Sequence, residues 1–128
     1  MDGKMILLID DEKDFSELLK IHLEAITDLA IAIAADGKTG IALAKKIKPA
    51  LIFLDIVMPG MDGYEVLRKL KKDRATVDIP VVMLSAKGDA ESKIKAAQLY
   101  NEEYITKPVE AHDLKAKIEE ILKRRGIA

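Results

Sequence analysis

The chain has 128 residues, of which 49% are hydrophobic and 34% are charged, a balance that suits one folded domain and excludes intrinsic disorder. The net charge of −1 excludes a general basic field for nucleic acid, and the absence of cysteine excludes disulfides, thiol catalysis and thiolate metal sites. No apolar run approaches the roughly 18 residues of a membrane span, so we expect a cytoplasmic domain without membrane insertion.

Five short apolar runs are spaced along the chain as strands would be if helices separated them. Each run is about as long as a strand, and most of its residues are apolar without in-and-out alternation. Strands that are buried on both faces of a parallel sheet have this pattern. The predicted strands are Met5–Ile9, Leu29–Ala34, Leu51–Leu54, Val81–Leu84 and Tyr104–Thr106.

Amphipathic stretches follow the apolar runs, with apolar residues recurring at every third or fourth position. These stripes run from Phe15 to Ile26, from Gly40 to Ile47, from Val66 to Leu70, from Ile94 to Gln98 and from Leu114 to Leu122. Gly37 and Gly63 are expected to precede helices, and Gly126 to end the last one. The alternation predicts an α/β fold, a (βα)5 doubly wound sheet of five parallel strands.

Reactive side chains follow four of the five predicted strands. Asp10 and Asp11 follow the first run, Asp55 the third, Ser85 the fourth and Lys107 the fifth. In open α/β sheets, ligands bind beyond the carboxyl ends of the strands. We therefore expect three carboxylates, one hydroxyl group and one ammonium group to meet at a single edge of the sheet.

Three carboxylates at one edge repel one another, by about 4 kcal/mol for a pair ~4 Å apart at an effective dielectric constant of about 20. A divalent cation and the Lys107 ammonium group would relieve this repulsion, and an all-oxygen site that retains several waters suits Mg²⁺. A carboxylate beside Mg²⁺ and an ammonium group can accept a phosphoryl group and form an aspartyl phosphate. The Ser85 hydroxyl group could then hydrogen-bond a phosphoryl oxygen.

Each of these residues also has an ordinary structural interpretation. Asp10 and Asp11 can cap the helix that begins near Glu12. Ser85 can be a strand-end hydroxyl bonded to the backbone, and Lys107 can be a solvated surface side chain. Taken singly, the residues leave these alternatives open.

Four motifs carry a more specific signal: Ile9-Asp10-Asp11-Glu12, Leu54-Asp55-Ile56-Val57-Met58-Pro59-Gly60-Met61-Asp62-Gly63, Leu84-Ser85-Ala86 and Tyr104-Ile105-Thr106-Lys107-Pro108. With them the sequence resembles the receiver domains of two-component response regulators, the CheY-like family, over essentially its whole length. The resemblance implies the flavodoxin-like strand order 2-1-3-4-5. It also implies that residues 1–128 form a single receiver domain, with no output domain.

The resemblance implies a role for each strand-end residue. Asp55 is the phosphoacceptor, and Ser85 and Lys107 contact the phosphoryl group. The implied Mg²⁺ ligands are Asp10, Asp11, Asp55 and the backbone carbonyl group of Val57. Tyr104 occupies the position of the family's switch aromatic, although packing in the core alone is an alternative for this side chain.

The function that this resemblance implies is a phosphorylation-controlled signalling switch, not an enzyme that turns over an external substrate. A sensor histidine kinase or a histidine phosphotransfer protein donates the phosphoryl group. The surface of the fourth helix, the fifth strand and the fifth helix then changes its binding to an unknown downstream protein, with the chain a monomer or a phosphorylation-dependent dimer. We expect no direct binding to nucleic acid, and interpret the basic run of Lys69, Lys71, Lys72 and Arg74 as a solvated helix end.

Three other functions remain as alternatives. An aspartate-based phosphatase would need a second acid two residues after Asp55, where the chain has Val57. A flavin-binding protein of the flavodoxin type would need a phosphate-cradling loop after the first strand, where the acids at 10–12 would repel a phosphate. A scaffold that works without phosphorylation would not need the complete set of acids, hydroxyl and lysine.

Overall fold

The computed structural model describes residues 4–85, 103–107 and 109–126, and the predicted alternation of strands and helices is present in them. The elements are β1 (Met5–Ile9), α1 (Lys13–Ile26), β2 (Ala30–Ala34), α2 (Gly37–Ile47), β3 (Leu51–Asp55), α3 (Gly63–Lys72), β4 (Val81–Ser85), β5 (Glu103–Thr106) and α5 (Ala111–Arg124). The helix predicted from the stripe between Ile94 and Gln98 lies outside the described residues. None of the described helices is long and apolar enough to cross a membrane.

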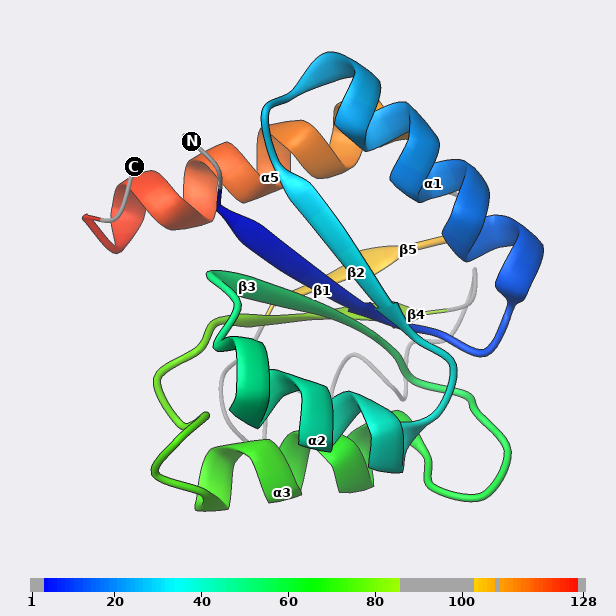
Figure 1. Cartoon of the computed structure of the whole chain (residues 1–128), viewed down its shortest axis with the longest axis vertical. Helices are drawn as coiled ribbons and strands as arrows, with labels where there is room; N and C mark the ends of the chain where they lie inside the picture. The colour runs from blue at the N-terminus through cyan, green and yellow to red at the C-terminus, as the bar shows by residue number, and fades with distance from the viewer. Residues whose placement is uncertain (1–3, 86–102, 108, 127–128) are drawn as a thin grey trace.

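The five strands form one parallel sheet in the order β2-β1-β3-β4-β5, which confirms the predicted fold. Helices α1 and α5 cover one face of this sheet, and α2 and α3 cover the other (Figure 1). Because both faces are covered, every residue of β3 and β4 is buried. This double burial is the physical reason why the strands lack alternating polar residues.

Two apolar cores lie on the two faces of the sheet, and β1 contributes to both. Leu7 and Ile9 pack into the core beneath α2 and α3, whereas Ile6 and Leu8 pack into the core beneath α1 and α5. Successive side chains of a strand point to opposite faces, so a run of apolar residues serves both cores. Packing on both faces thereby fixes β1 up to Ile9, the residue that precedes Asp10.

The helix starts differ in one detail from the expectation. Gly37 and Gly63 do not precede α2 and α3 but are the first residues of these helices. The preceding residues, Asp36 and Asp62, are the N-caps, and their carboxylates accept hydrogen bonds from backbone N–H groups in the first turn. Gly126 follows α5 with φ of 72°, a conformation that favours glycine, and confirms the predicted helix end.

The space at the start of α3 explains the glycine there. A Cβ atom at Gly63 would lie 2.4 Å from the backbone oxygen of Asp55 and 2.7 Å from the Cα atom of Ile56. The Gly63 N–H group donates to the Ile56 carbonyl oxygen at 2.7 Å, which closes the loop between β3 and α3. The start of α3 therefore lies directly against the backbone of Asp55 and Ile56 at the end of β3.

Candidate functional site

Asp10 is held at the carboxyl end of β1 by both its backbone and its side chain. Its N–H group donates to the carbonyl oxygen of Ala34 at 3.0 Å and so continues the pairing with β2. Its side chain is 1% exposed, and Oδ1 accepts a hydrogen bond from the Glu12 N–H group at 2.9 Å. The N-cap residue of α1 is Glu12, which has no side-chain cap. Helix capping alone therefore does not account for Asp10.

Asp55 lies beside Asp10 because β1 and β3 are neighbours in register, with Ile9 opposite Leu54. Asp55 is the last residue of β3 and is 6% exposed, whereas Asp11 is exposed. Asp10, Asp11 and Asp55 each offer a carboxylate oxygen, and these three atoms all lie within 4.8 Å of one another. The structure thus brings together the three acids that the strand ends predicted.

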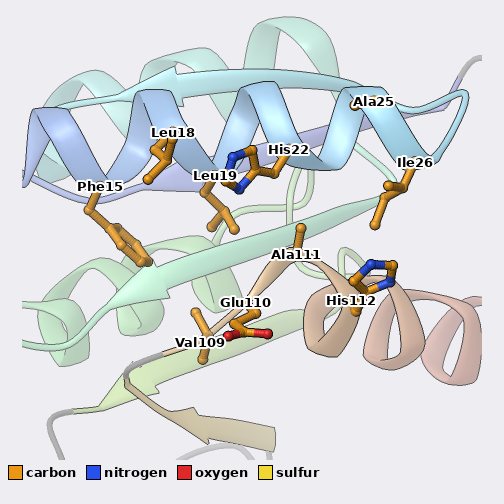
Figure 2. A pocket seen from close by; sticks show the side chains of 10 residues that line it. All are labelled: Phe15, Leu18, Leu19, His22, Ala25, Ile26, Val109, Glu110, Ala111 and His112. Carbon is orange, nitrogen blue, oxygen red and sulfur yellow. The ribbon is translucent and has the colours of Figure 1, made fainter.

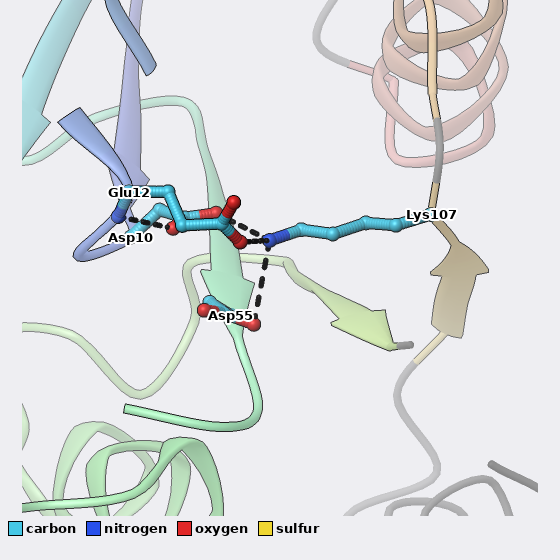
Figure 3. Close-up of polar contacts among 4 residues, drawn as sticks. All are labelled: Asp10, Glu12, Asp55 and Lys107. Carbon is cyan, nitrogen blue, oxygen red and sulfur yellow. Dashed lines mark hydrogen bonds and ion pairs between the residues drawn. The ribbon is translucent and has the colours of Figure 1, made fainter. Parts of the chain in front are cut away.

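Lys107 reaches this cluster from the end of β5, as Figure 3 shows. Its Nζ atom lies 2.8 Å from Asp10 Oδ2, 3.0 Å from Glu12 Oε1 and 3.6 Å from Asp55 Oδ1. The Lys107 N–H group donates to the Ser85 carbonyl oxygen at 2.7 Å, which places the residue next to the end of β4. Because the side chain is only 16% exposed, its interpretation as a solvated surface lysine is wrong.

Sequence reasoning missed two partners of Lys107. The sequence assigns no site role to Glu12, yet its carboxylate is paired with the Lys107 ammonium group. Phe15 was assigned to the stripe of α1, yet its ring centroid lies 4.7 Å from Lys107 Nζ, within the range of a cation–π contact. The sequence did contain one indication of this contact: Phe15 begins the apolar stripe of α1 about one turn after the acids at 10–12, which places its ring close to the site.

Ser85 is fully buried as the last residue of β4. Its hydroxyl group has no hydrogen-bond partner among the residues that the structure describes. Within the described residues, the structure therefore does not support a strand-end serine whose hydroxyl group is bonded to the backbone. The next strand, β5, starts one residue earlier than predicted and pairs Thr106 with Ser85.

Tyr104 and Val57 both lie at the surface. Tyr104, in β5, is 36% exposed and is not part of either core, which counts against packing in the core as its sole role. Val57 follows β3 with its side chain 69% exposed, while its backbone N–H group donates a hydrogen bond to the Asp55 carboxylate. The Val57 backbone is thus beside the acid that the resemblance assigns as the phosphoacceptor.

The charges of the site alter the protonation of Asp55. Burial, together with the nearby carboxylates of Asp10 and Asp11, raises the pKa of Asp55 to about 6. Lys107 and the Val57 N–H group act in the opposite direction, because both stabilise the ionised form. Burial alone would lower the pKa of Lys107, but its hydrogen bonds to Asp10 and Glu12 raise it, so its ammonium group stays charged.

The donor set fits a hard divalent cation and a phosphoryl group. Three carboxylates within one small volume repel one another, and oxygen ligands of this kind suit Mg²⁺. The buried Ser85 hydroxyl group and the Lys107 ammonium group are the donors that phosphoryl oxygens require. The predicted helix that would complete the neighbouring surface lies outside the described residues.

A groove of about 460 Å³ between α1 and the start of α5 lies next to the site, and we call it the α1–α5 groove. Figure 2 shows side chains of α1 and of the segment leading into α5 facing one another across it. Phe15, which lines one end, also contacts Lys107. The other lining residues are Leu18, Leu19, His22, Ala25, Ile26, Val109, Glu110, Ala111 and His112.

Comparisons with known proteins agree with this geometry. The chain is similar to the phosphate regulon transcriptional regulatory protein PhoB of Pseudomonas aeruginosa, with 39% identity over 126 residues that cover 98% of this chain and 55% of that protein. It is also similar to the DNA-binding dual master transcriptional regulator RpaA of Synechocystis, with 39% identity over 93% of this chain and 49% of that protein. The chain thus spans about half the length of these relatives.

Solved structures give the same result. A response regulator receiver domain protein from Clostridium thermocellum superposes with a TM-score of 0.85 at 28% identity, covering 97% of this chain and 98% of that one. A Francisella response regulator receiver domain superposes with a TM-score of 0.84 at 28% identity, covering 96% and 99%. The profile of the response regulator receiver domain matches residues 6–119. The chain therefore belongs to the receiver domain family of two-component response regulators.

Proposed function

We propose that Asp55 accepts a phosphoryl group from a phosphohistidine of a sensor histidine kinase or a histidine phosphotransfer protein. The observation that carries the proposal is the position of the Asp55 carboxylate, 3.6 Å from Lys107 Nζ and within 4.8 Å of the oxygens of Asp10 and Asp11. In this step an Asp55 oxygen forms a bond to phosphorus while the phosphorus–nitrogen bond to the imidazole breaks. The electron pair of that bond remains on the imidazole nitrogen, and an aspartyl phosphate is formed.

The residues that would hold Mg²⁺ are Asp10, Asp11, Asp55 and the backbone carbonyl group of Val57. When bound, the cation supplies positive charge that neutralises the oxygens of the transferred phosphoryl group. Lys107, which follows β5 at the same edge of the sheet, contributes a second positive charge and is held in place by Asp10 and Glu12. Since Asp55 must be ionised to attack phosphorus, these positive charges also favour its reactive form.

Ser85 and Tyr104 are proposed to turn phosphorylation into a change of surface. The Ser85 hydroxyl group lacks a partner among the described residues, and a phosphoryl oxygen on Asp55 would provide one. Tyr104 lies two residues before the position paired with Ser85, and we propose that its ring moves into the space left when Ser85 shifts toward the phosphoryl group. A downstream protein then binds the altered surface of β5, α5 and the predicted fourth helix. We propose that this surface binds a protein and that the chain of 128 residues does not bind nucleic acid directly.

The α1–α5 groove is the surface that we propose for the phosphodonor protein. It adjoins the site through Phe15, and its walls are mostly apolar. Leu18, which lines the groove, is 55% exposed, and Ile21 on the same helix lies outside the lining and is 63% exposed, so apolar surface continues from the groove onto α1. Apolar surface of this kind next to a reactive group is typical of an interface.

The test is the intact mass of the protein after treatment with acetyl phosphate, with and without Mg²⁺. We expect one added phosphoryl group in the presence of Mg²⁺, and none in Asp55→Asn. Asp62→Asn is the matched control, because Asp62 lies in the adjacent loop and asparagine preserves its N-cap role. This control should be phosphorylated like the wild type. Phosphorylation of Asp55→Asn would refute the assignment, and an unmodified wild-type protein would favour a scaffold that works without phosphorylation.

A further inference from the structure

A second groove, between α2 and α3, lies on the opposite face of the sheet from the α1–α5 groove (Figure 1). We call it the α2–α3 groove; its volume is about 1060 Å³. Five cationic side chains and one carboxylate line it, on a chain whose net charge is −1. The cations are Lys38, Lys45, Lys69, Lys72 and Arg74. Positive charge is therefore concentrated on this part of the surface.

Most of this positive charge is not neutralised within the described part of the chain. Asp73 pairs with Lys45 at 2.9 Å, and no described carboxylate lies within 4.0 Å of the other four cations. Cations in the last turn of a helix are favoured by the helix dipole, which explains Lys45, Lys69 and Lys72. The dipole does not explain Lys38, which lies in the first turn of α2, where a positive charge is unfavourable.

The base of the α2–α3 groove is apolar. Ile41, Ala42 and Met61 line it, and Ile41 and Met61 pack against the core beneath. A free phosphate or a nucleic acid backbone gains little from an apolar base. Among the described residues, no aromatic side chain lines the groove, so bases of a single-stranded nucleic acid would find no described ring on which to stack. The groove instead suits a ligand that is apolar on one side and acidic along its edges.

The spacing of the cations matches a helix. Cations without a described carboxylate partner lie on both helices: Lys38 on α2, and Lys69 and Lys72 on α3, which are about 4.5 Å apart along the helix axis, close to one turn. We propose that the α2–α3 groove binds an acidic amphipathic helix of a partner protein. Its apolar stripe lies on Ile41, Ala42 and Met61, and its carboxylates face the cations on both sides. Because the two grooves lie on opposite faces of the sheet, this partner and the phosphodonor can be bound together.

The probes for the test are synthetic peptides of about 14 residues that form amphipathic helices. Three peptides carry a leucine stripe flanked by glutamates in three different registers, and a scrambled peptide of the same composition lacks the stripe. Binding is followed by chemical shift changes in the ¹⁵N-labelled full chain. We expect at least one of the three peptides to bind, with the shifts confined to α2, α3 and the flanking lining residues Met61, Asp73 and Arg74, and no binding of the scrambled peptide.

Charge-reversed variants locate the binding surface. Lys38→Glu combined with Lys69→Glu is expected to weaken binding about tenfold at low salt. Lys46→Glu combined with Lys123→Glu changes the net charge equally at exposed lysines outside the groove, and should leave binding unchanged. Ala42→Gln, which places a polar side chain on the base, should weaken binding without altering the fold, as judged by the thermal unfolding curve.

Three results would overturn the inference. They are failure of all three peptides to bind, equal loss of binding in the two charge-reversed variants, and shifts that map outside the groove. A duplex and a single-stranded oligonucleotide are tested in the same way, and stronger binding of either at the groove would replace the helix by a nucleic acid. Since none of the altered residues belongs to the Asp55 site, the variants should still accept a phosphoryl group, which separates this inference from the proposed function.

Discussion

Strand β3 joins two regions of contrasting character, an apolar interior and a charged edge. The four residues from Leu51 to Leu54 are at most 1% exposed, and Asp55, which follows them, is 6% exposed. The apolar side chains gain free energy from burial, whereas burial and neighbouring acids disfavour the ionised carboxylate of Asp55. Burial of the apolar residues therefore stabilises the folded state, whereas burial of the Asp55 carboxylate at the end of the same strand destabilises it. The fold tolerates this carboxylate because the apolar contribution is larger.

The largest expected effect is the loss of packing in the interior. Phe53 is 1% exposed and is among the largest fully buried side chains, so Phe53→Ala should lower the free energy of unfolding by about 4 kcal/mol. Urea denaturation measures the change. The control is Val57→Ala, four residues further along the chain, where the side chain is 69% exposed and the expected change is below about 0.5 kcal/mol. Equal effects of the two substitutions would contradict the contrast.

The next effect concerns the junction between interior and edge. Gly63→Ala would place a Cβ atom 2.4 Å from the Asp55 backbone oxygen, so the backbone must shift, at a cost of about 3 kcal/mol. The shift should also slow phosphorylation by acetyl phosphate. Gly126→Ala is the control: its φ of 72° is unfavourable for alanine, but the added Cβ atom would have no neighbour within 4 Å in the described part of the chain, so a cost of about 1 kcal/mol is expected. A Gly63→Ala protein as stable as the wild type would show that the loop yields easily.

Neutralising the edge should raise stability. The pKa of Asp55 is about 6 in the folded protein and 3.8 in its ordinary state. The folded state therefore binds the Asp55 proton more tightly than the unfolded state does. The resulting contribution to the free energy of unfolding is complete below about pH 4 and is lost as the pH rises through 6. In Mg²⁺-free buffer, Asp55→Asn should be more stable than the wild type by about 2 kcal/mol at pH 7.5, and this advantage should shrink toward pH 4.

Thermal unfolding at several pH values measures this advantage. Adding Mg²⁺ at about a hundred times its dissociation constant should stabilise the wild type by about 2.7 kcal/mol, since the cation binds only the folded state. Asp55→Asn, which lacks one of the proposed ligands, should gain less. A pH-independent difference between the two proteins, or an equal gain on adding Mg²⁺, would contradict the electrostatic account of the edge.

The smallest effect compares two buried hydroxyl groups. Ser85 lacks a partner among the described residues, whereas Thr76 Oγ1 donates to the Leu70 carbonyl oxygen at 2.7 Å. Ser85→Ala should change the free energy of unfolding by less than about 0.5 kcal/mol, and Thr76→Val should lower it by about 1 kcal/mol. Urea denaturation of both variants checks the order. A larger loss for Ser85→Ala would mean that its hydroxyl group is already bonded in the unphosphorylated protein.

Much of the fold and of the site was predictable from local patterns. Continuous apolar runs and helical stripes predicted the strands and helices, and because parallel strands run in the same direction, their carboxyl ends were placed at one edge of the sheet. This is why Asp10, Asp11, Asp55, Ser85 and Lys107 were expected to meet. The strand order was supplied by the resemblance to receiver domains, because periodicity in a single sequence does not specify which strands are neighbours.

The sequence by itself therefore determined which residues lie at the carboxyl edge of the sheet. Only the tertiary structure decided which of these residues pair with one another and how their pKa values change. The hydrogen bond from Lys107 to Asp10 joins residues that are 97 positions apart. The pairing with Glu12, the ring of Phe15 near Lys107 and the raised pKa of Asp55 depend on such distances and on burial. The same holds for the α2–α3 groove, because charges and apolar side chains from separate helices form a binding surface only when packing brings them together.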